Sequence, residues 1–480
     1  MLKTIDLKGR PFHFIGIGGI GMSALAYILA ERDLPVSGSD LRSTHITRRL
    51  AKVGATIFDS QTSNNLDFLA TQGAFFSPQV VCSTAIDPNN QEYRACRDRG
   101  YPIYHRSDLL AALIADYQSI AVAGTHGKTT TSSLIGYVLL QGGLDPTVII
   151  GGEVDAWGGN ARSGRSNVLV AEADESDGSL VKYTAKIGVI TNIELDHTDR
   201  YQNLAEVVKI FQTFASQCET IVACIDCENT QKLLELEGFP SISYSIDPEK
   251  DADYTAKNVS YHSSETVAEI WEKGQLLGRL RSPLLGKHNL SNALATVAVG
   301  RERGLSFEVI SDAISNFEGA KRRFEVRGSV NNITLVDDYA HHPSEIRVTL
   351  AAARLQIDGL SRKRLVAVFQ PHRYSRTATF LAEFAAAFED ADLVIVTDIY
   401  SAGETNFNNI SGATVASAIS ARHKKNKNVL YHPSDNDLNE LLQENLRPGD
   451  LVLFLGAGNL NQTIPKLIDL LSCRSQKKSA

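Results

Sequence analysis

The segment Ala123–Thr131, AGTHGKTTT, combines glycine, lysine and hydroxyl residues in the way needed to hold a nucleoside triphosphate. Glycines let the backbone turn tightly enough for several N–H groups to converge on phosphate oxygens, and a helix after the loop adds the positive end of its dipole. Lys128 is suited to neutralise the outer phosphates, and Thr129 to ligate magnesium. The glycines at Gly124 and Gly127 are closer together than in the common form of such loops. We predict a nucleotide-binding loop here.

Two acidic turns follow this loop, each at the end of a predicted strand: EADESD at 172–177 and NIELDH at 192–197. Carboxylates in such turns could hold magnesium against a triphosphate, or they could simply be solvated turns or helix caps. The loop favours the first interpretation, in which Thr129 would complete the set of ligands. Magnesium prefers oxygen ligands, so His197 either binds a second ion or acts from the outer coordination shell.

Three polar turns follow predicted strands in the last third of the chain, at 337–343, 371–376 and 398–404. Arg373 and Arg376 stand three residues apart at a predicted helix start. They could share one face and bind a carboxylate or phosphate bidentately, although surface arginines are often only solvated.

A second glycine-rich turn lies near the amino terminus, at 16–21, and Asp40 follows at the end of the next predicted strand. This spacing fits the fingerprint of a dinucleotide-binding βαβ unit, so a nicotinamide-dependent oxidoreductase is one alternative. A hydride-transfer enzyme has no evident need for the second phosphate loop at 124–129, whereas the pyrophosphate of a substrate would use the same amides. We expect the turn to bind such a substrate.

The elements that position these residues alternate between strand and helix, which predicts an α/β fold of three domains. A Rossmann-like N-terminal domain is expected over 1–116, a central ATPase-like domain with a phosphate loop and a parallel sheet over 117–323, and a Rossmann-like C-terminal domain over 324–480. A polar stretch at about 244–285 should add antiparallel strands to the central domain, and one helix is expected over Ala378–Ala387. Open α/β sheets place their sites at strand ends, where these polar turns lie.

Composition excludes several kinds of partner. The 480 residues are 43% hydrophobic and 21% charged, and the formal net charge is −7, so neither nucleic acid nor an anionic membrane surface is an expected partner. No segment reaches the roughly 18 apolar residues needed to span a bilayer. The six cysteines are scattered, as is typical of a reducing compartment. We expect a cytoplasmic protein with small-molecule partners, as a monomer or weak homodimer.

Taken in order, the motifs resemble those of the Mur ligases, three-domain ATP-dependent enzymes that add amino acids to a UDP-linked muramic acid precursor of peptidoglycan. The resemblance covers nearly the whole chain. Its motifs are GIGGIGMS at 16–23, GTHGKTT at 124–130, EADESD at 172–177, TNIELDH at 191–197, HN at 288–289, RRFE at 322–325, DDYAHHP at 337–343 and QPHRYSR at 370–376. They look most similar to the family members that add the first amino acid, L-alanine, to UDP-N-acetylmuramate.

The resemblance implies that the first domain binds the UDP moiety, that the second binds ATP with two Mg²⁺ ions, and that the third closes over both with the amino acid. The residues implied for UDP-substrate binding are Gly18, Gly19, Ile20, Gly21, Met22, Asp40 and Ser83. Those implied for ATP are Gly124, Thr125, His126, Gly127, Lys128, Thr129 and Thr130, with His288, Asn289 and Asn292 near the adenine, Asp338 near the ribose and Arg323 near the phosphates. The amino acid would meet Tyr339, His341, Arg373 and Arg376. The residues implied in catalysis are Lys128, His197, Arg323, His341, Arg373 and Arg376, and the metal ligands implied are Thr129, Glu172 and His197.

The reaction implied by the resemblance starts with attack of the lactyl carboxylate on the γ-phosphate, which gives an acyl phosphate and ADP. The amine of alanine then displaces phosphate, and His341, His342 or Glu175 could accept its proton. Two further functions stay open at this point. One is that of a recycling ligase, which joins a preformed peptide to the same sugar nucleotide but has a different N-terminal turn, and the second is that of a sensor that binds ATP without catalysis.

Overall fold

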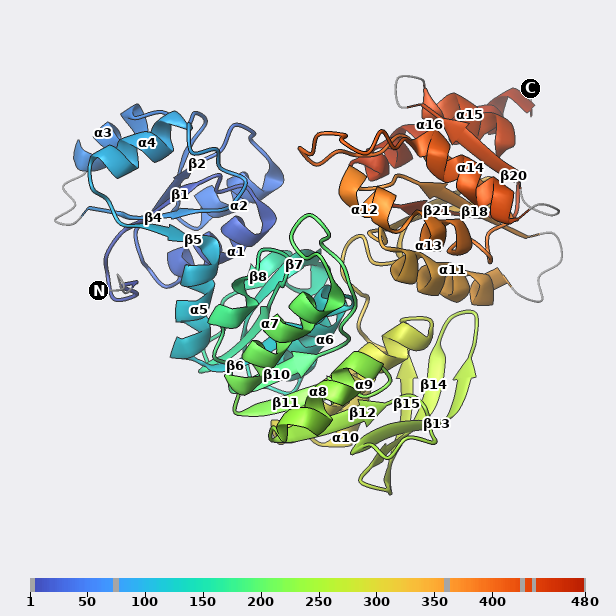
Figure 1. Cartoon of the computed structure of the whole chain (residues 1–480), viewed down its shortest axis with the longest axis horizontal. Coiled ribbons are helices and arrows are strands. Elements are labelled where there is room, and N and C mark those ends of the chain that lie inside the picture. Colours follow the sequence, from blue (N-terminus) through green and yellow to red (C-terminus); the bar gives the residue numbers. More distant parts are fainter. Residues whose placement is uncertain (1–4, 72–76, 358–362, 424–427, 434–436, 479–480) are drawn as a thin grey trace.

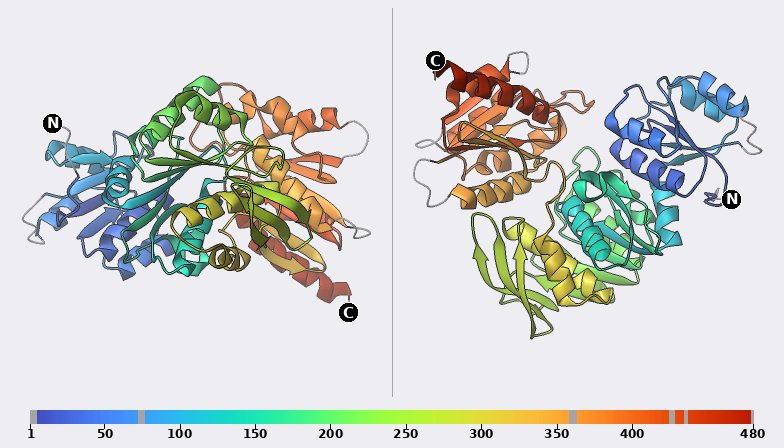
Figure 2. Two further views of the ribbon diagram at one scale, coloured as in Figure 1. Left: turned by 90° about the horizontal axis from the view of Figure 1, so that it is seen from below. Right: turned by 180° about the vertical axis from the view of Figure 1, so that it is seen from behind.

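In the computed structural model, the chain forms three domains, each built on its own β-sheet (Figure 1). The structure describes residues 5–71, 77–357, 363–423, 428–433 and 437–478. The N-terminal, central and C-terminal domains have sheets of five, ten and six strands. The first and last sheets lie on opposite flanks of the central one, as the views in Figure 2 also show. The predicted class, an α/β chain of three domains, is confirmed.

The N-terminal sheet is entirely parallel, in the order β3-β2-β1-β4-β5. Its middle strand, with the sequence FHFI, is fully buried, as expected for a strand covered by helices on both faces. The strands are β1 (Phe12–Ile15), β2 (Val36–Ser39), β3 (Thr56–Phe58), β4 (Gln79–Cys82) and β5 (Ile103–His105), and the helices are α1 (Ile20–Glu31), α2 (His45–Lys52), α3 (Asn64–Thr71), α4 (Gln91–Asp98) and α5 (Arg106–Asp116).

The central sheet has the order β15-β14-β13-β12-β11-β10-β6-β9-β7-β8. Strands β13 to β15 are antiparallel, which confirms the prediction for the polar stretch, and they extend one edge of the sheet. The strands are β6 (Gln118–Ala123), β7 (Thr147–Val154), β8 (Gly159–Arg162), β9 (Val168–Glu172), β10 (Ile187–Ile190), β11 (Thr220–Cys224), β12 (Ser241–Ser245), β13 (Tyr254–Tyr261), β14 (Thr266–Glu272) and β15 (Gln275–Ser282). The helices are α6 (Lys128–Gln141), α7 (Leu204–Ser216), α8 (Glu228–Glu237), α9 (Lys287–Glu302) and α10 (Phe307–Ser315), with 3₁₀ turns η1 (Asp155–Trp157) and η2 (Ser179–Lys182).

The C-terminal sheet has the order β16-β17-β21-β18-β19-β20 and is parallel except for the pair β16–β17. The strands are β16 (Glu325–Val330), β17 (Ile333–Asp338), β18 (Arg364–Phe369), β19 (Leu393–Thr397), β20 (Asn428–His432) and β21 (Asp450–Leu455). The helices are α11 (Pro343–Ile357), α12 (Tyr374–Thr379), α13 (Leu381–Ala386), α14 (Gly412–Arg422), α15 (Leu438–Asn445) and α16 (Thr463–Lys478), with a 3₁₀ turn η3 (Leu460–Gln462). The single helix predicted over Ala378–Ala387 is wrong, because two short helices meet at Phe380, where the backbone leaves helical geometry.

The hydrophobic core joins the domains unequally. One cluster of buried residues runs from β1 and α1 of the N-terminal domain into β9, β10 and α7 of the central domain. The C-terminal domain is built on clusters of its own, with Leu195 of the central domain packed against one of them. The contacts between the central and C-terminal domains described below are polar. Among the described residues, no helix is both long and apolar enough to cross a membrane.

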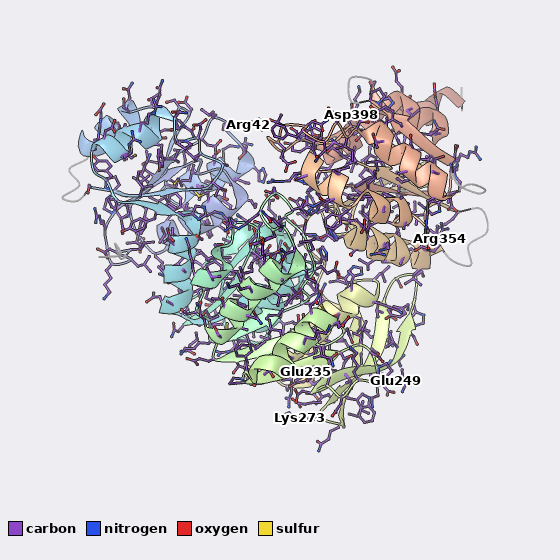
Figure 3. All side chains as sticks on the ribbon, viewed as in Figure 1. Arg42, Glu235, Glu249, Lys273, Arg354 and Asp398 are labelled. Carbon is purple, nitrogen blue, oxygen red and sulfur yellow. The ribbon has the colours of Figure 1, made fainter. Side chains whose placement is uncertain are left out.

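Charged side chains mostly lie on the outer surface, as Glu235, Glu249 and Lys273 do at the lower edge of the view in Figure 3. Glu175 and Asp196 are exceptions, since they are almost fully buried. Both belong to turns that were predicted to carry chemistry. Burying an ion is costly unless it is paired, so these positions require partners.

Candidate active site

The predicted nucleotide-binding loop joins β6 to α6, and its two glycines are required by the backbone. Gly124 and Gly127 have φ values of +139° and +83°, which other residues rarely adopt. A Cβ on Gly124 would lie 1.9 Å from Oγ1 of Thr191, and one on Gly127 would lie 2.8 Å from Oδ1 of Asn292. The loop therefore depends on glycine at both positions and leads directly into the first turn of α6.

Lys128, the first residue of α6, is held by the loop itself and by buried carboxylates. Its Nζ donates to the carbonyl oxygen of Gly124 at 2.7 Å and to Oε2 of Glu175 at 2.8 Å, and Oδ1 of Asp174 lies 3.8 Å away. Burial alone would lower the pKa of Lys128, but Glu175 and Asp174 outweigh burial and raise it. The lysine is therefore a permanent cation beside the loop.

Two groups of side chains near the loop contain predicted metal ligands and offer donors to divalent cations. In the first, Oγ1 of Thr129 donates to Oε1 of Glu172 at 3.1 Å, and burial raises the pKa of that carboxyl group. In the second, Asp174, Glu175 and His197 each place a ligand atom within 4.8 Å of the others. The oxygen atoms of the first group suit magnesium, and the second group, with one imidazole, also suits manganese. Each group therefore offers donors that suit a divalent cation.

A pocket of about 390 Å³ opens beside the loop, between the central and C-terminal domains. Burial lowers the pKa of His288 to about 4 and raises the pKa of Asp338 to about 6. His288 is therefore uncharged at pH 7 and suited to a neutral ring system. Eight of the residues expected to meet ATP line this pocket: His126, Gly127, Thr130, His288, Asn289, Asn292, Arg323 and Asp338. Gly124 and Thr125 lie in the adjoining loop, and Lys128 and Thr129 begin α6.

The aromatic residues expected to receive the amino acid form a row in the C-terminal domain. The rings of Tyr339 and His341 lie 5.3 Å apart, and those of His341 and His372 lie 5.7 Å apart. Nη1 of Arg376 lies 3.2 Å from Nδ1 of His372. Burial lowers the pKa of His341 to about 4 and that of His372 to about 2, so both imidazoles are uncharged at pH 7. His372 thus links the predicted residues, although the sequence interpretation gave it no role.

Arg376 and Arg373, which belong to the same segment as His372, bind different carboxylates of the central domain. Nε of Arg376 donates to Oδ1 of Asp196 at 2.8 Å. Nη1 of Arg373 donates to Oδ2 of Asp199 at 2.8 Å and lies 3.3 Å from Oε1 of Glu404. Arg373 precedes α12 with a φ of +67°, outside helical geometry. Instead of gripping one group from one helix face, as their spacing predicted, the arginines join the two domains at two points.

Glu345 connects the nucleotide-binding loop to the C-terminal domain, and no role was predicted for it. Its Oε1 lies 3.2 Å from Nδ1 of His126, while its Oε2 accepts the backbone N–H groups of His341 and His342 at 3.0 and 3.2 Å. Nε2 of His126 lies 3.5 Å from Glu194. Burial opposes the charge on His126, but Glu194 and Glu345 raise its pKa to about 10. A sequence signal existed, because Glu345 occupies the third position of α11, where glutamate often caps a helix.

The N-terminal glycine turn connects β1 to α1, with Gly19, Ile20, Gly21 and Met22 around the helix start. The N–H of Gly18 donates to Oδ2 of Asp40 at 2.9 Å, and the N–H of Arg42 donates to Oδ1 at 3.0 Å. The carboxylate of Asp40 therefore braces the turn. Met22 is buried, so it can offer a ligand only its backbone.

Ser83 follows β4 directly, and β4 and β2 both pair with β1. The structure therefore brings Ser83, Asp40 and the glycine turn to the same edge of the N-terminal sheet.

A second cavity, of about 750 Å³, lies where all three domains meet. Its lining includes Arg106 from the N-terminal domain, His197 and Arg200 from the central domain, and Arg373 from the C-terminal domain. Because His197 also belongs to the second group of metal-ligand candidates, this cavity reaches the carboxylates of Asp174 and Glu175 that surround Lys128.

Three family models match successive parts of the chain: "Mur ligase family, catalytic domain" over residues 11–118, "Mur ligase middle domain" over 122–300, and "Mur ligase, glutamate ligase domain" over 322–458. A UDP-N-acetylmuramate–L-alanine ligase of Gloeothece citriformis is 61% identical, across 98% of this chain and 99% of its own length. The chain belongs to the Mur ligase family. A Mur ligase of Microcystis aeruginosa with the same name is also 61% identical, across 98% of both chains.

Solved Mur ligase structures agree with the arrangement of domains. The UDP-N-acetylmuramate-alanine ligase of Thermotoga maritima has a TM-score of 0.78 at 28% identity and covers 98% of this chain and 99% of its own. A murein peptide ligase of Psychrobacter arcticus has a TM-score of 0.67 at 22% identity, over 97% and 99%, which shows a shared fold. Membership of the Mur ligase family excludes the oxidoreductase alternative.

Proposed function

We propose that this chain is an ATP-dependent ligase that joins L-alanine to the lactyl carboxylate of UDP-N-acetylmuramate, in the synthesis of peptidoglycan precursors. One observation carries the proposal: residues of all three domains line one cavity, and Asp174 beside it lies 3.8 Å from both Lys128 of the phosphate loop and Arg106 of the N-terminal domain. The names of relatives about 60% identical over the full length support the choice of substrates. All three binding surfaces come from one chain, which suits a monomer or a weak homodimer.

The first chemical step activates the carboxylate, because an amine cannot expel oxide from it at neutral pH. The lactyl oxygen attacks the γ-phosphorus of ATP in line, the bond to the bridging oxygen breaks, and ADP leaves an acyl phosphate. We assign Lys128 and Arg323 to the phosphate charge, with His288, Asn289 and Asn292 at the adenine and Asp338 at the ribose. All of these residues except Lys128 line the nucleotide pocket, and Lys128 belongs to the adjoining phosphate-loop motif.

Thr129 and Glu172 would hold one magnesium ion, and His197, with Asp174 and Glu175, would hold a second. When bound, such ions neutralise phosphate charge and so ease the approach of the anionic carboxylate. The residues of the chain do the positioning: Glu172 is fixed by the N–H of Gly151 at 2.7 Å.

In the second step the amine of alanine adds to the acyl carbon, and phosphate leaves. We assign the carboxylate of alanine to Arg373, which is about one-third exposed and lines the three-domain cavity. Tyr339, His341 and Arg376 would complete this subsite. The amine must lose a proton, and among His341, His342 and Glu175 we favour His341, because its ring lies between those of Tyr339 and His372 in the proposed amino-acid subsite.

Phosphate release tests the proposal. Purified protein is incubated with ATP, magnesium and UDP-N-acetylmuramate, and L-alanine, glycine, L-serine and a muramyl tripeptide are compared. We expect release with L-alanine and its loss in Lys128→Ala. Release with the tripeptide alone would identify a recycling ligase instead, and ATP binding without release under any condition would identify a nucleotide sensor.

A further inference from the structure

Arg106 brings a cation of the N-terminal domain into the three-domain cavity, and none of the roles above accounts for it. It is the first residue of α5. Its Nη2 donates to Oδ2 of Asp177 at 2.9 Å and lies 3.8 Å from Oδ2 of Asp174. The side chain of Asp177 is only 9% exposed, so the guanidinium is anchored in a mostly buried acidic turn of the central domain.

The other edge of the guanidinium faces the glycine turn. Nη1 of Arg106 lies 3.4 Å from the position that a Cβ of Gly21 would occupy. Among the described residues, the one hydrogen bond that the Arg106 side chain makes is donated by Nη2 to Asp177. Nη1 and Nε are therefore available to a ligand that lies against the first turn of α1, where backbone N–H groups also lack helical partners.

The position of Arg106 also lies on the route that the substrate must take. Asp174 is 3.8 Å from Arg106 on one side and 3.8 Å from Nζ of Lys128 on the other. A sugar nucleotide that extends from the glycine turn to a phosphate at Lys128 must therefore pass the guanidinium. Because the lactyl carboxylate must reach the phosphate at Lys128, the pyrophosphate is the anionic part of this ligand that the turn and Arg106 can meet.

We propose that Arg106 binds the pyrophosphate of the sugar nucleotide, together with the amides of the glycine turn, and that Asp177 orients its guanidinium for this purpose. The inference rests on the proposed function, because it takes UDP-N-acetylmuramate as the ligand. A planar guanidinium held at one edge by a carboxylate presents its other edge to phosphate oxygens in a fixed geometry.

Calorimetric titration of the full chain, without ATP, tests the proposal with UDP and UDP-N-acetylmuramate as probes. Arg106→Ala should weaken the binding of both probes by roughly tenfold to a hundredfold, as expected for the loss of a charged hydrogen bond. Arg106→Lys should restore part of the affinity. Asp177→Asn removes the carboxylate that orients the guanidinium but retains the arginine, so it should weaken binding less than Arg106→Ala.

Arg49→Ala is the matched control. Arg49 also reaches from the N-terminal to the central domain, where its Nη2 donates to the carbonyl oxygen of Ala161 at 2.9 Å, but it lies outside the lining of the cavity. The control should bind both probes as the wild type does. Binding of ATP, measured on every variant, reports that the protein is folded.

The outcomes separate this inference from the proposed function. If Arg106→Ala binds UDP as tightly as the wild type while the wild type turns over substrate, the inference fails and the function stands. A loss confined to UDP-N-acetylmuramate would assign Arg106 to the lactyl carboxylate and overturn the pyrophosphate assignment. A wild type that binds neither probe would refute the proposed function itself.

Discussion

The ion pair between Asp196 and Arg376 predicts a large coupling energy between the central and C-terminal domains. Nε of Arg376 lies 2.8 Å from Oδ1 of Asp196, and the two side chains are only 3% and 5% exposed. Asp196→Asn keeps the shape of the side chain but leaves a buried guanidinium without its counter-ion. Loss of one partner from such a pair costs about 3–5 kcal/mol. Arg376→Met likewise leaves the buried carboxylate of Asp196 without its counter-ion.

Because either single substitution already breaks the pair, the double variant should be destabilised by much less than the sum of the single effects. We expect a coupling energy of at least about 2 kcal/mol. Hydrogen exchange of α12 measured by mass spectrometry reports the local opening free energy for the cycle. The control is the exposed pair Glu228–Lys232, for which hydrogen exchange is measured on α8. This pair should show no measurable coupling, since water screens it. A coupling at Asp196–Arg376 no larger than that of the control would refute the reasoning.

Three further predictions concern the loop, its histidine and the metal. Gly124→Ala should abolish ATP binding in a titration, because a Cβ there meets a hydroxyl at 1.9 Å, whereas Gly143→Ala, which meets nothing within 4 Å, should retain binding. Glu194 and Glu345 raise the pKa of folded His126 from 6.5 to about 10, so its stabilisation is complete below pH 6.5 and is lost as the pH rises through 10. The difference in Tm between wild type and His126→Gln should therefore shrink over that range, and a constant difference would contradict the assignment. Chelation of divalent cations should stop ADP formation but leave UDP binding unchanged, as calorimetry can check.

The parts of this protein that depend on local backbone geometry were predictable from the sequence. The phosphate loop lies between β6 and α6 as expected, because glycine spacing and the following lysine are requirements of one short segment. The helix expected over Ala378–Ala387 failed for a tertiary reason. The helix is interrupted at Phe380, whose ring lies 4.9 Å from that of His342 and packs into the core of the domain. Helical periodicity continues through this point, so the break has no local signal.

The pairing of charges across domains had no local signal either. His126 and Glu345 are 219 positions apart, and Arg376 and Asp196 are 180 positions apart. Each motif, read alone, contains charged residues without an evident partner, which is why the sequence interpretation assigned Arg373 and Arg376 to a ligand. In the folded chain, some of these charges neutralise one another: the acidic turn after β10 provides carboxylates for the arginines after β18, and α11 provides one for the loop after β6. His126, Glu345, Asp199 and Arg373 also line the two cavities, so several residues that join the central and C-terminal domains also face a cavity. A charge substitution at this junction should therefore alter domain contact and substrate affinity together.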